Sequence, residues 1–165
     1  WNAFGKTLHT QINDTLAAHG ARFCAVGAEL EAGRVGNLEV IAWSEDTEVD
    51  AIQNMDIGVM PLPDTPWARG KCGYKLIQYM ACGLPVVASP VGVNKEIVEH
   101  GVNGFLAESD AEWRTAIEAL ISDPELRQRM GAAGRTKVEN EYSLQVWGPR
   151  VANMLRSVAN KETST

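Results

Sequence analysis

The fold is decided by the stretch Gly70-Lys-Cys-Gly-Tyr-Lys-Leu-Ile-Gln-Tyr-Met-Ala-Cys-Gly-Leu-Pro-Val-Val-Ala-Ser-Pro90, which predicts a loop, a helix and a buried strand in succession. The helix is expected to begin at Gly73 and to bury one face, because apolar residues recur there at helical spacing: Leu76, Ile77, Met80 and Ala81. Gly83 is expected to end the helix, and Pro85 to prevent it from resuming. The β-branched run at residues 86–88 then predicts a parallel strand covered on both faces.

The start of this helix suits an anion. A helix N-terminus offers unpaired backbone N–H groups and a partial positive charge. Gly73 would let a phosphate approach the backbone, and Lys75 in the first turn would add a full charge. Lys75, Gln78 and Tyr79 share a second face of the helix. Many helices begin with glycine and carry a surface lysine, so these residues alone leave phosphate binding and an ordinary surface helix both open.

Composition narrows the class of protein. A chain of 165 residues is expected to form one domain that buries about 70% of its unfolded surface, and 45% hydrophobic residues is typical of globular proteins. The net charge of −6 argues against a nucleic-acid partner, so any anion site must be local. Cys24, Cys72 and Cys82 lack metal-ligand spacing and are expected to be reduced thiols, as in a cytoplasmic protein. No apolar run is long enough to span a membrane.

Helices and strands are expected to alternate along the rest of the chain. Further helices are predicted at residues 4–19, 45–54, 95–100, 110–121, from 124 onward and 143–158, and further strands at residues 21–26, 38–43, 57–60 and 105–107. Three side chains are expected to cap helices: Ser44, Asn94 and Asp110. Residues 29–36 are predicted to be a turn-rich connection, residues 61–70 a stiff proline-rich loop, and Pro149 a kink in the last helix.

This alternation predicts an α/β fold with a Rossmann-like parallel sheet and helices on both faces. Ligands of such sheets bind at the carboxyl ends of the strands, where the loops after Met60 and Ala88 lie. Other site types find no support. The three histidines have no partners at metal-ligand spacing, and the chain contains no Gly-x-Ser-x-Gly elbow and no Walker-type or complete Gly-x-Gly-x-x-Gly loop. We therefore expect no metal and no cofactor.

Residues 56–106 resemble a known family through three segments: Asp56-Ile-Gly-Val-Met-Pro-Leu62, Gly73-Tyr-Lys-Leu-Ile-Gln-Tyr-Met-Ala-Cys-Gly-Leu-Pro-Val-Val-Ala-Ser89 and Gly92-Val-Asn-Lys-Glu-Ile-Val-Glu-His-Gly-Val-Asn-Gly-Phe-Leu106. They are similar to the C-terminal, donor-nucleotide-binding half of GT-B retaining glycosyltransferases of the group 1 type. Weaker similarity extends over nearly the whole chain. The resemblance implies a Rossmann-like nucleotide-sugar-binding domain at residues 1–142, a kinked helix packed on it at residues 143–160, and a tail at residues 161–165.

The resemblance also implies a set of site residues. The donor diphosphate would bind at Gly73, Tyr74, Lys75, Val91, Gly92 and Val93. Two positions that are acidic in the family, one for the sugar and one for the ribose, are occupied here by Gly70 and Gln78. Gln78 would still hydrogen-bond ribose hydroxyls, while Arg69 or Lys71 would act on the sugar side and favour an altered or charged donor.

On the nucleobase side, the resemblance implies Trp43 and Ser44. Trp43 is expected either to stack on the base or to be a half-buried core residue.

The activity implied is that of a hexosyltransferase, which moves a sugar from a nucleotide diphosphate sugar to an acceptor with retention of configuration and without a metal. An N-terminal domain outside this chain would hold the acceptor, so no residue here is assigned as catalytic and little turnover is expected from the chain alone. The chain opens at Trp1 rather than Met, which agrees with a fragment. Any peripheral membrane association would come through the other half. A non-catalytic nucleotide-binding or interaction module and a nucleotide-sugar epimerase remain alternatives.

Overall fold

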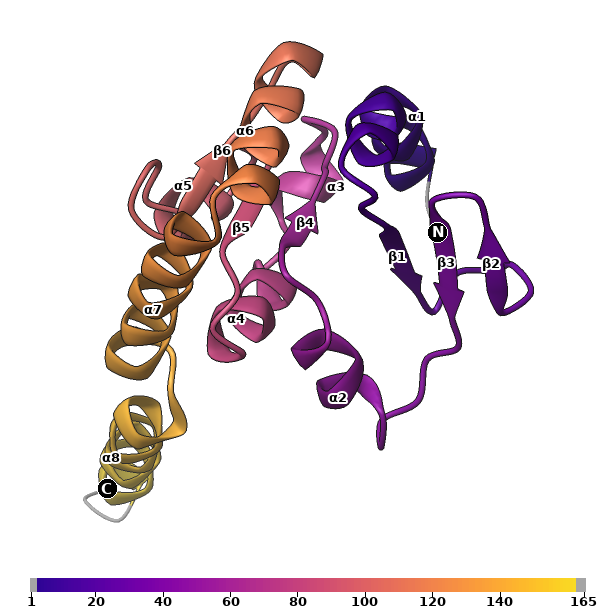
Figure 1. Cartoon of the computed structure of the whole chain (residues 1–165). Helices are drawn as coiled ribbons and strands as arrows, with labels where there is room; N and C mark the ends of the chain where they lie inside the picture. The colour runs from indigo at the N-terminus through magenta and orange to yellow at the C-terminus, as the bar shows by residue number, and fades with distance from the viewer. Residues whose placement is uncertain (1–2, 163–165) are drawn as a thin grey trace.

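Helices and strands alternate along the chain in the computed structural model, which describes residues 3–162 (Figure 1). The strands are β1 (Phe23–Val26), β2 (Gly33–Val35), β3 (Leu38–Ile41), β4 (Gly58–Met60), β5 (Val86–Ala88) and β6 (Gly104–Leu106). The helices are α1 (Ala3–Ala18), α2 (Glu48–Gln53), α3 (Pro66–Arg69), α4 (Tyr74–Ala81), α5 (Asn94–Ile97), α6 (Asp110–Ser122), α7 (Pro124–Glu141) and α8 (Leu144–Glu162). The predicted α/β class is confirmed. Of the predicted tail at residues 161–165, the first two residues continue α8, and the last three lie outside the described part.

The strands form two three-stranded sheets instead of the one parallel sheet that the sequence predicts. In the second sheet, β4, β5 and β6 are all parallel, with Val59, Val87 and Phe105 in register. In the first, β1 pairs parallel to β3, but β2 pairs antiparallel to it. The sequence analysis missed β2 because it read residues 29–36 as turns. The left-handed backbone of Gly36, at φ +59°, lets the chain double back onto β3.

The two sheets end on strands that face a common cleft. β1 is at one end of the first sheet and β4 at one end of the second, so each has one edge without a strand partner. Phe23 and Val26 of β1, and Ile57 and Val59 at β4, line the same cleft of about 460 Å³. The cleft therefore lies between the edge strands of the two sheets.

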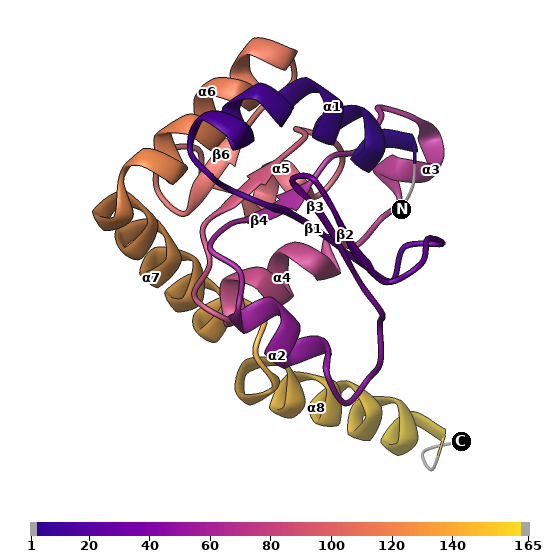
Figure 2. The ribbon, with the colours of Figure 1, turned by 45° about the vertical axis from the view of Figure 1, so that its right-hand side comes forward.

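The core confirms that the strand after α4 is covered on both faces. On one side Val87 packs in a cluster with buried side chains of α1 and α6, among them Leu8, Ile12, Trp113 and Leu120; Figure 2 shows α1 and α6 side by side. On the other side Val86 and Ala88 pack with α4, α5 and α7, through Leu76, Met80, Ile97 and Val138. Because successive side chains of a strand point to opposite faces, each face of β5 packs against its own layer of helices.

Both predicted boundaries of α4 are confirmed. Gly73 precedes the helix at φ +68°, and Gly83 follows it at φ +77°. The amide of Gly83 donates to the carbonyl of Met80 at 2.9 Å, and the amide of Leu84 donates to the carbonyl of Tyr79 at 3.0 Å. This pair of bonds is the Schellman motif expected where glycine ends a helix.

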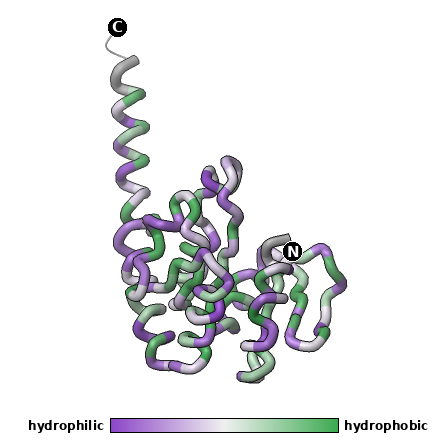
Figure 3. The backbone as a smooth tube through the Cα atoms, turned by 90° about the horizontal axis from the view of Figure 1, so that it is seen from above, coloured by the Kyte–Doolittle hydropathy of each residue, from purple (hydrophilic) through white to green (hydrophobic). Residues whose placement is uncertain are grey.

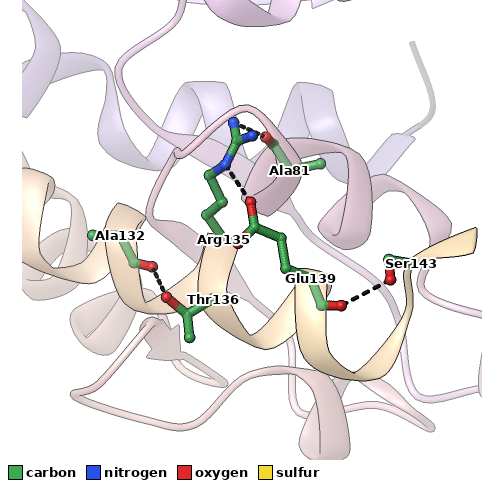
Figure 4. Close-up of polar contacts among 6 residues, drawn as sticks. All are labelled: Ala81, Ala132, Arg135, Thr136, Glu139 and Ser143. Atoms are coloured by element: carbon green, nitrogen blue, oxygen red, sulfur yellow. Dashed lines mark hydrogen bonds and ion pairs between the residues drawn. The ribbon is translucent and has the colours of Figure 1, made fainter. Parts of the chain in front are cut away.

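A neighbouring helix also caps α4. Arg135 of α7 donates from Nη1 to the carbonyl of Ala81 at 3.0 Å, while its Nε donates to Glu139 at 2.8 Å (Figure 4). Helix α7 comes this close because Gly131 has no side chain: a Cβ there would lie 1.9 Å from the carbonyl oxygen of Gly83. Gly131 therefore serves packing between two helices and does not interrupt α7.

Three predicted N-caps are wrong. Helix α2 starts after Thr47, although the Ser44 hydroxyl does accept from the Thr47 amide at 3.2 Å. Helix α5 starts after Val93, because the side chain of Asn94 is buried and donates to the carbonyl of Ser89 instead. Helix α6 is capped one residue earlier than predicted, by Ser109.

Two local sequence motifs explain the starts of α6 and α3. Ser109 forms a capping box with Glu112, which satisfies two backbone donors reciprocally and so outcompetes Asp110 as the cap. In the proline-rich loop, the hydroxyl of Thr65 accepts from the amide of Ala68, and Pro66 takes the first helical position of the short helix α3. The loop expected at residues 61–70 therefore contains a turn of helix.

Helix α8 continues through Pro149 to Glu162 as one helix. It projects away from the rest of the chain, with hydrophobic segments along its length (Figure 3). The described apolar side chains that remain exposed along it are Leu144, Trp147, Val151, Met154, Leu155 and Val158. The apolar stripe that the sequence predicts is present, and much of it is uncovered.

Candidate functional site

The carboxylate of Glu48 gathers three side chains from two other parts of the chain. Its Oε1 accepts a hydrogen bond from Lys75 Nζ at 2.5 Å and another from Trp43 Nε1 at 3.0 Å. Its Oε2 accepts from Gln78 Nε2 at 3.0 Å. Lys75 and Gln78 lie on α4, Trp43 lies in the loop after β3, and Glu48 is the first residue of α2. The structure thus brings together predicted phosphate, ribose and nucleobase positions around a residue that the sequence analysis did not select.

Glu48 is held as an anion. Its side chain is only 18% exposed, and the hydrogen bonds from Lys75, Trp43 and Gln78 lower its pKa from an ordinary 4.5 to about 2. The hydrogen bond from Lys75 is the largest cause. A charge-assisted contact of this kind fixes both side chains in place. The negative charge of Glu48 offsets the positive charge of Lys75, so the cluster as a whole is close to neutral.

Two groups of the cluster remain open to a ligand. The indole of Trp43 is 55% exposed, which makes it a surface platform and not the half-buried core residue that was the alternative. The Lys75 side chain is 48% exposed, and an ammonium has three donors. Gln78 contributes a different feature: its Oε1 is buried and has no hydrogen-bond partner among the described residues. A buried acceptor without a partner is uncommon and invites a donor from outside the chain.

The turn after β5, residues 89–93, lies against the loop that precedes α4. Gly92 has a left-handed backbone at φ +55°, and a Cβ there would lie 2.6 Å from the carbonyl oxygen of Arg69. The amide of Val91 already donates to the carbonyl of Ser89 at 2.8 Å, so a ligand would have to share it. The turn therefore approaches α3 closely, which places Gly92 beside the predicted sugar-side residue Arg69 and Val93 beside Gly73.

Gly73 has a packing role that the sequence did not reveal. A Cβ at this position would lie 2.3 Å from Cδ1 of Ile97 and 3.3 Å from Cγ1 of Val93. The missing side chain thus makes room for α5 and the turn before it. Tyr74, the next residue, is exposed at the first position of α4.

The cations predicted on the sugar side already have partners. Arg69 forms a two-pronged ion pair with Asp64, at 2.5 Å from Nε to Oδ1 and 2.8 Å from Nη2 to Oδ2, and its hydrogen bond lowers the pKa of Asp64. The ammonium of Lys71 lies 4.5 Å from the ring centroid of Trp67, a cation–π contact. Gly70, between them, ends α3 and leaves this position without any side chain.

A second cleft, of about 420 Å³, opens at the carboxyl ends of β4 and β5. It is lined by Pro61 and Leu62 after β4 and by Ser89 and Pro90 after β5. The hydroxyl of Ser89 accepts from the amide of Leu62 at 3.0 Å and ties the two loops together. The expectation that these loops share one edge of the sheet is confirmed.

Glu48 is the site residue that sequence reasoning missed. Its signal in the sequence was its place in the first turn of a short helix, four residues after Ser44, where an acidic residue is ordinary. Among residues 3–162 no group of three or more His, Cys, Asp or Glu side chains is placed to hold a metal ion. In the same part of the chain no helix has the length and apolar character needed to cross a membrane.

A sequence profile of one family, described as glycosyl transferases group 1, matches residues 4–123. Among curated proteins, the N-acetyl-alpha-D-glucosaminyl L-malate synthase of Bacillus anthracis is 35% identical over 144 residues, which cover 85% of this chain and 36% of the synthase. The chain therefore spans little more than a third of that relative.

Two solved structures share the fold. A glycosyltransferase from Rickettsia africae matches with a TM-score of 0.75 at 14% identity, over 96% of this chain and 45% of its own. Anabaena HepE, solved in complex with UDP and glucose, matches with a TM-score of 0.65 at 22% identity, over 92% of this chain and 36% of its own. At this level of identity the likeness concerns the fold alone.

Proposed function

The chain belongs to the glycosyl transferases group 1 family, and we propose that it binds the nucleotide diphosphate sugar donor for retaining transfer of the sugar to an acceptor. One observation carries the proposal: Trp43, Gln78 and Lys75 meet around one carboxylate, although they come from two separate parts of the chain. These are the positions expected for base, ribose and diphosphate. The complex of HepE with UDP and glucose is consistent with a ligand of this class.

The chemistry would be electrostatic. Departure of the sugar leaves negative charge on the diphosphate, and a fixed ammonium stabilises that charge without a metal. Lys75 is in the first turn of α4, so its charge adds to the partial positive charge of the helix N-terminus. The ion pair with Glu48 holds the ammonium in place before the ligand arrives. No metal or cofactor is part of the proposal.

The acceptor would bind to an N-terminal domain of a longer parent protein. The unpaired edges of β1 and β4 are consistent with a longer parent, because a further strand between them would join the two sheets. The uncovered apolar stripe of α8 is a second surface that such a domain would cover. We accordingly expect the chain alone to bind the donor with little or no turnover.

Calorimetry with UDP, GDP, ADP and UDP-glucose tests the proposal. At least one of these ligands should bind the chain, and Lys75→Ala should weaken that binding by roughly ten- to a hundred-fold, the usual effect of losing a charge-assisted hydrogen bond. Lys6→Ala is the matched control, because Lys6 is an exposed lysine on α1, outside the site. The proposal fails if no nucleotide binds, or if both variants behave alike.

The departures at Gly70 and Gln78 favour a second candidate, a non-catalytic nucleotide-binding or interaction module. The longer parent distinguishes the two. Sugar transfer that is lost on Lys75→Ala supports the transferase, whereas nucleotide binding without transfer from any donor supports the module. Interconversion of a nucleotide sugar without an acceptor would instead identify an epimerase.

A further inference from the structure

Glu48 has acceptor capacity that its present partners do not fill. An ionised carboxylate offers about four acceptor positions over its two oxygens. Lys75 and Trp43 occupy two positions on Oε1, whereas among the described residues Oε2 receives a hydrogen bond only from Gln78. One acceptor position on Oε2 is therefore free, next to an amide whose own oxygen is buried without a partner. The free position on Oε2 suits a ligand that donates hydrogen bonds.

Charge decides which part of a ligand could bind there. The diphosphate of a nucleotide sugar, esterified at both ends, has no proton to donate at neutral pH and would be repelled by the carboxylate. Hydroxyl groups are neutral donors, and an acidic side chain that accepts from ribose hydroxyls is a general device of Rossmann-like nucleotide sites. The Glu48 side thus suits a diol, while the open side of the Lys75 ammonium suits an anion.

The order of the groups agrees with this assignment. Glu48 is hydrogen-bonded on one side to the exposed indole of Trp43 and on the other to the ammonium of Lys75. A nucleoside diphosphate has the same order: a flat base, a ribose and an anionic tail. We propose that Glu48 binds the ribose hydroxyls of the donor nucleotide. It would supply there the negative charge that Gln78, a neutral amide, lacks. This inference rests on the proposed function and adds a ligand-contacting residue to it.

A different role would give Glu48 the same contacts. It could act solely as a positioning residue that holds Lys75 for the diphosphate. The two roles differ in their dependence on the ribose hydroxyls. Loss of a positioning residue lowers the affinity for nucleotides with and without those hydroxyls equally. Loss of a residue that binds the ribose selectively lowers the affinity for nucleotides that carry them.

The experiment uses the 165-residue chain and the isosteric variant Glu48→Gln. Calorimetry would measure the affinities for UDP, GDP and ADP and for their 2′,3′-dideoxy counterparts. The wild-type chain should prefer the ribose form of the nucleotide that binds by about ten-fold, the usual value of a hydrogen bond to a charged group. Glu48→Gln should remove most of this preference, because any change that it causes through Lys75 falls equally on the ribose and the dideoxy forms. Glu45→Gln, an exposed neighbour, should keep the full preference.

The outcomes separate the inference from the proposed function. If the wild-type chain binds a nucleotide and Glu48→Gln keeps its preference for ribose, the inference is overturned and the proposed function stands. Equal weakening of both forms also overturns it and leaves Glu48 as a positioning residue for Lys75. If the wild-type chain binds no nucleotide of either form, the proposed function fails and the inference fails with it. Thermal unfolding of each variant confirms that the fold is intact.

Discussion

The carboxylate of Glu48 and the ammonium of Lys75 lie 2.5 Å apart, although 27 positions separate them in the sequence. Each comes from the first turn of a helix, α2 for Glu48 and α4 for Lys75. The contact therefore fixes the start of one helix relative to the other. It also places the exposed indole of Trp43 beside the first turn of α4 through the same carboxylate.

The first prediction concerns the pH dependence of this contact. The pKa of Glu48 is about 2 in the fold and near 4.5 when the side chain is free. The carboxylate therefore stabilises the fold fully above about pH 4.5, and this contribution is lost as the pH falls toward 2. Thermal midpoints of the wild type and Glu48→Gln should differ at pH 6, with the wild type higher, and should converge as the pH is lowered. A difference that stays constant down to pH 2 would show that the carboxylate is not engaged.

A second prediction tests Trp43 as a platform for the base. Stacking on an aromatic side chain contributes about 1–3 kcal/mol per base, so Trp43→Ala should weaken binding of the preferred nucleotide by roughly five- to a hundred-fold. Trp147→Ala is the control, because Trp147 is 43% exposed and lies on α8, outside the site. Calorimetry on both variants measures the effect. Comparable losses in the two would remove Trp43 from the nucleobase side.

A third prediction concerns the packing at Gly73. Gly73→Ala should destabilise the fold because a Cβ would lie 2.3 Å from Cδ1 of Ile97, and because φ +68° disfavours alanine by about 1–2 kcal/mol. Ile97→Val alone should cost about 0.5–1.5 kcal/mol. Since valine lacks Cδ1, the double variant should lose less stability than the sum of the two single variants. Urea denaturation of the wild type, the two single variants and the double variant measures these losses. If the two single losses add up to the loss in the double variant, Gly73 and Ile97 do not share this space.

A fourth prediction concerns the end of α4. Arg135→Ala removes the hydrogen bond to the carbonyl of Ala81 and should lower the free energy of unfolding by about 1 kcal/mol. Thr136 is adjacent on α7, and its hydroxyl donates only within that helix, to the carbonyl of Ala132 (Figure 4). Thr136→Ala should therefore change stability by less than about 0.5 kcal/mol. Chemical denaturation measures the free energy of unfolding of both variants. Equal losses in the two would contradict this account.

Local patterns in the sequence were sufficient for most of the elements. The span of α4 followed from Gly73 and Gly83, and the start of α7 from the pair Asp123-Pro124, because these residues act on the backbone within one turn. The β-branched run at β5 correctly predicted a strand buried on both faces. Where two adjacent residues could each cap a helix, as at Ser109 and Asp110, propensity alone predicted the wrong one. Ser109 is the cap because it forms reciprocal hydrogen bonds with Glu112.

The sequence by itself determined most of the helices and strands, though not β2 or α3, and which family the chain resembles, because both depend on residues that are close together along the chain. Only the tertiary structure decided that the strands divide into two sheets with a cleft between their edges. It also decided that Gly73 makes room for Ile97, and that Glu48 joins Trp43, Lys75 and Gln78. The physical reason is that hydrogen bonds and close packing act over a few ångströms in space. Residues tens of positions apart acquire a common role only when the fold brings them within that distance.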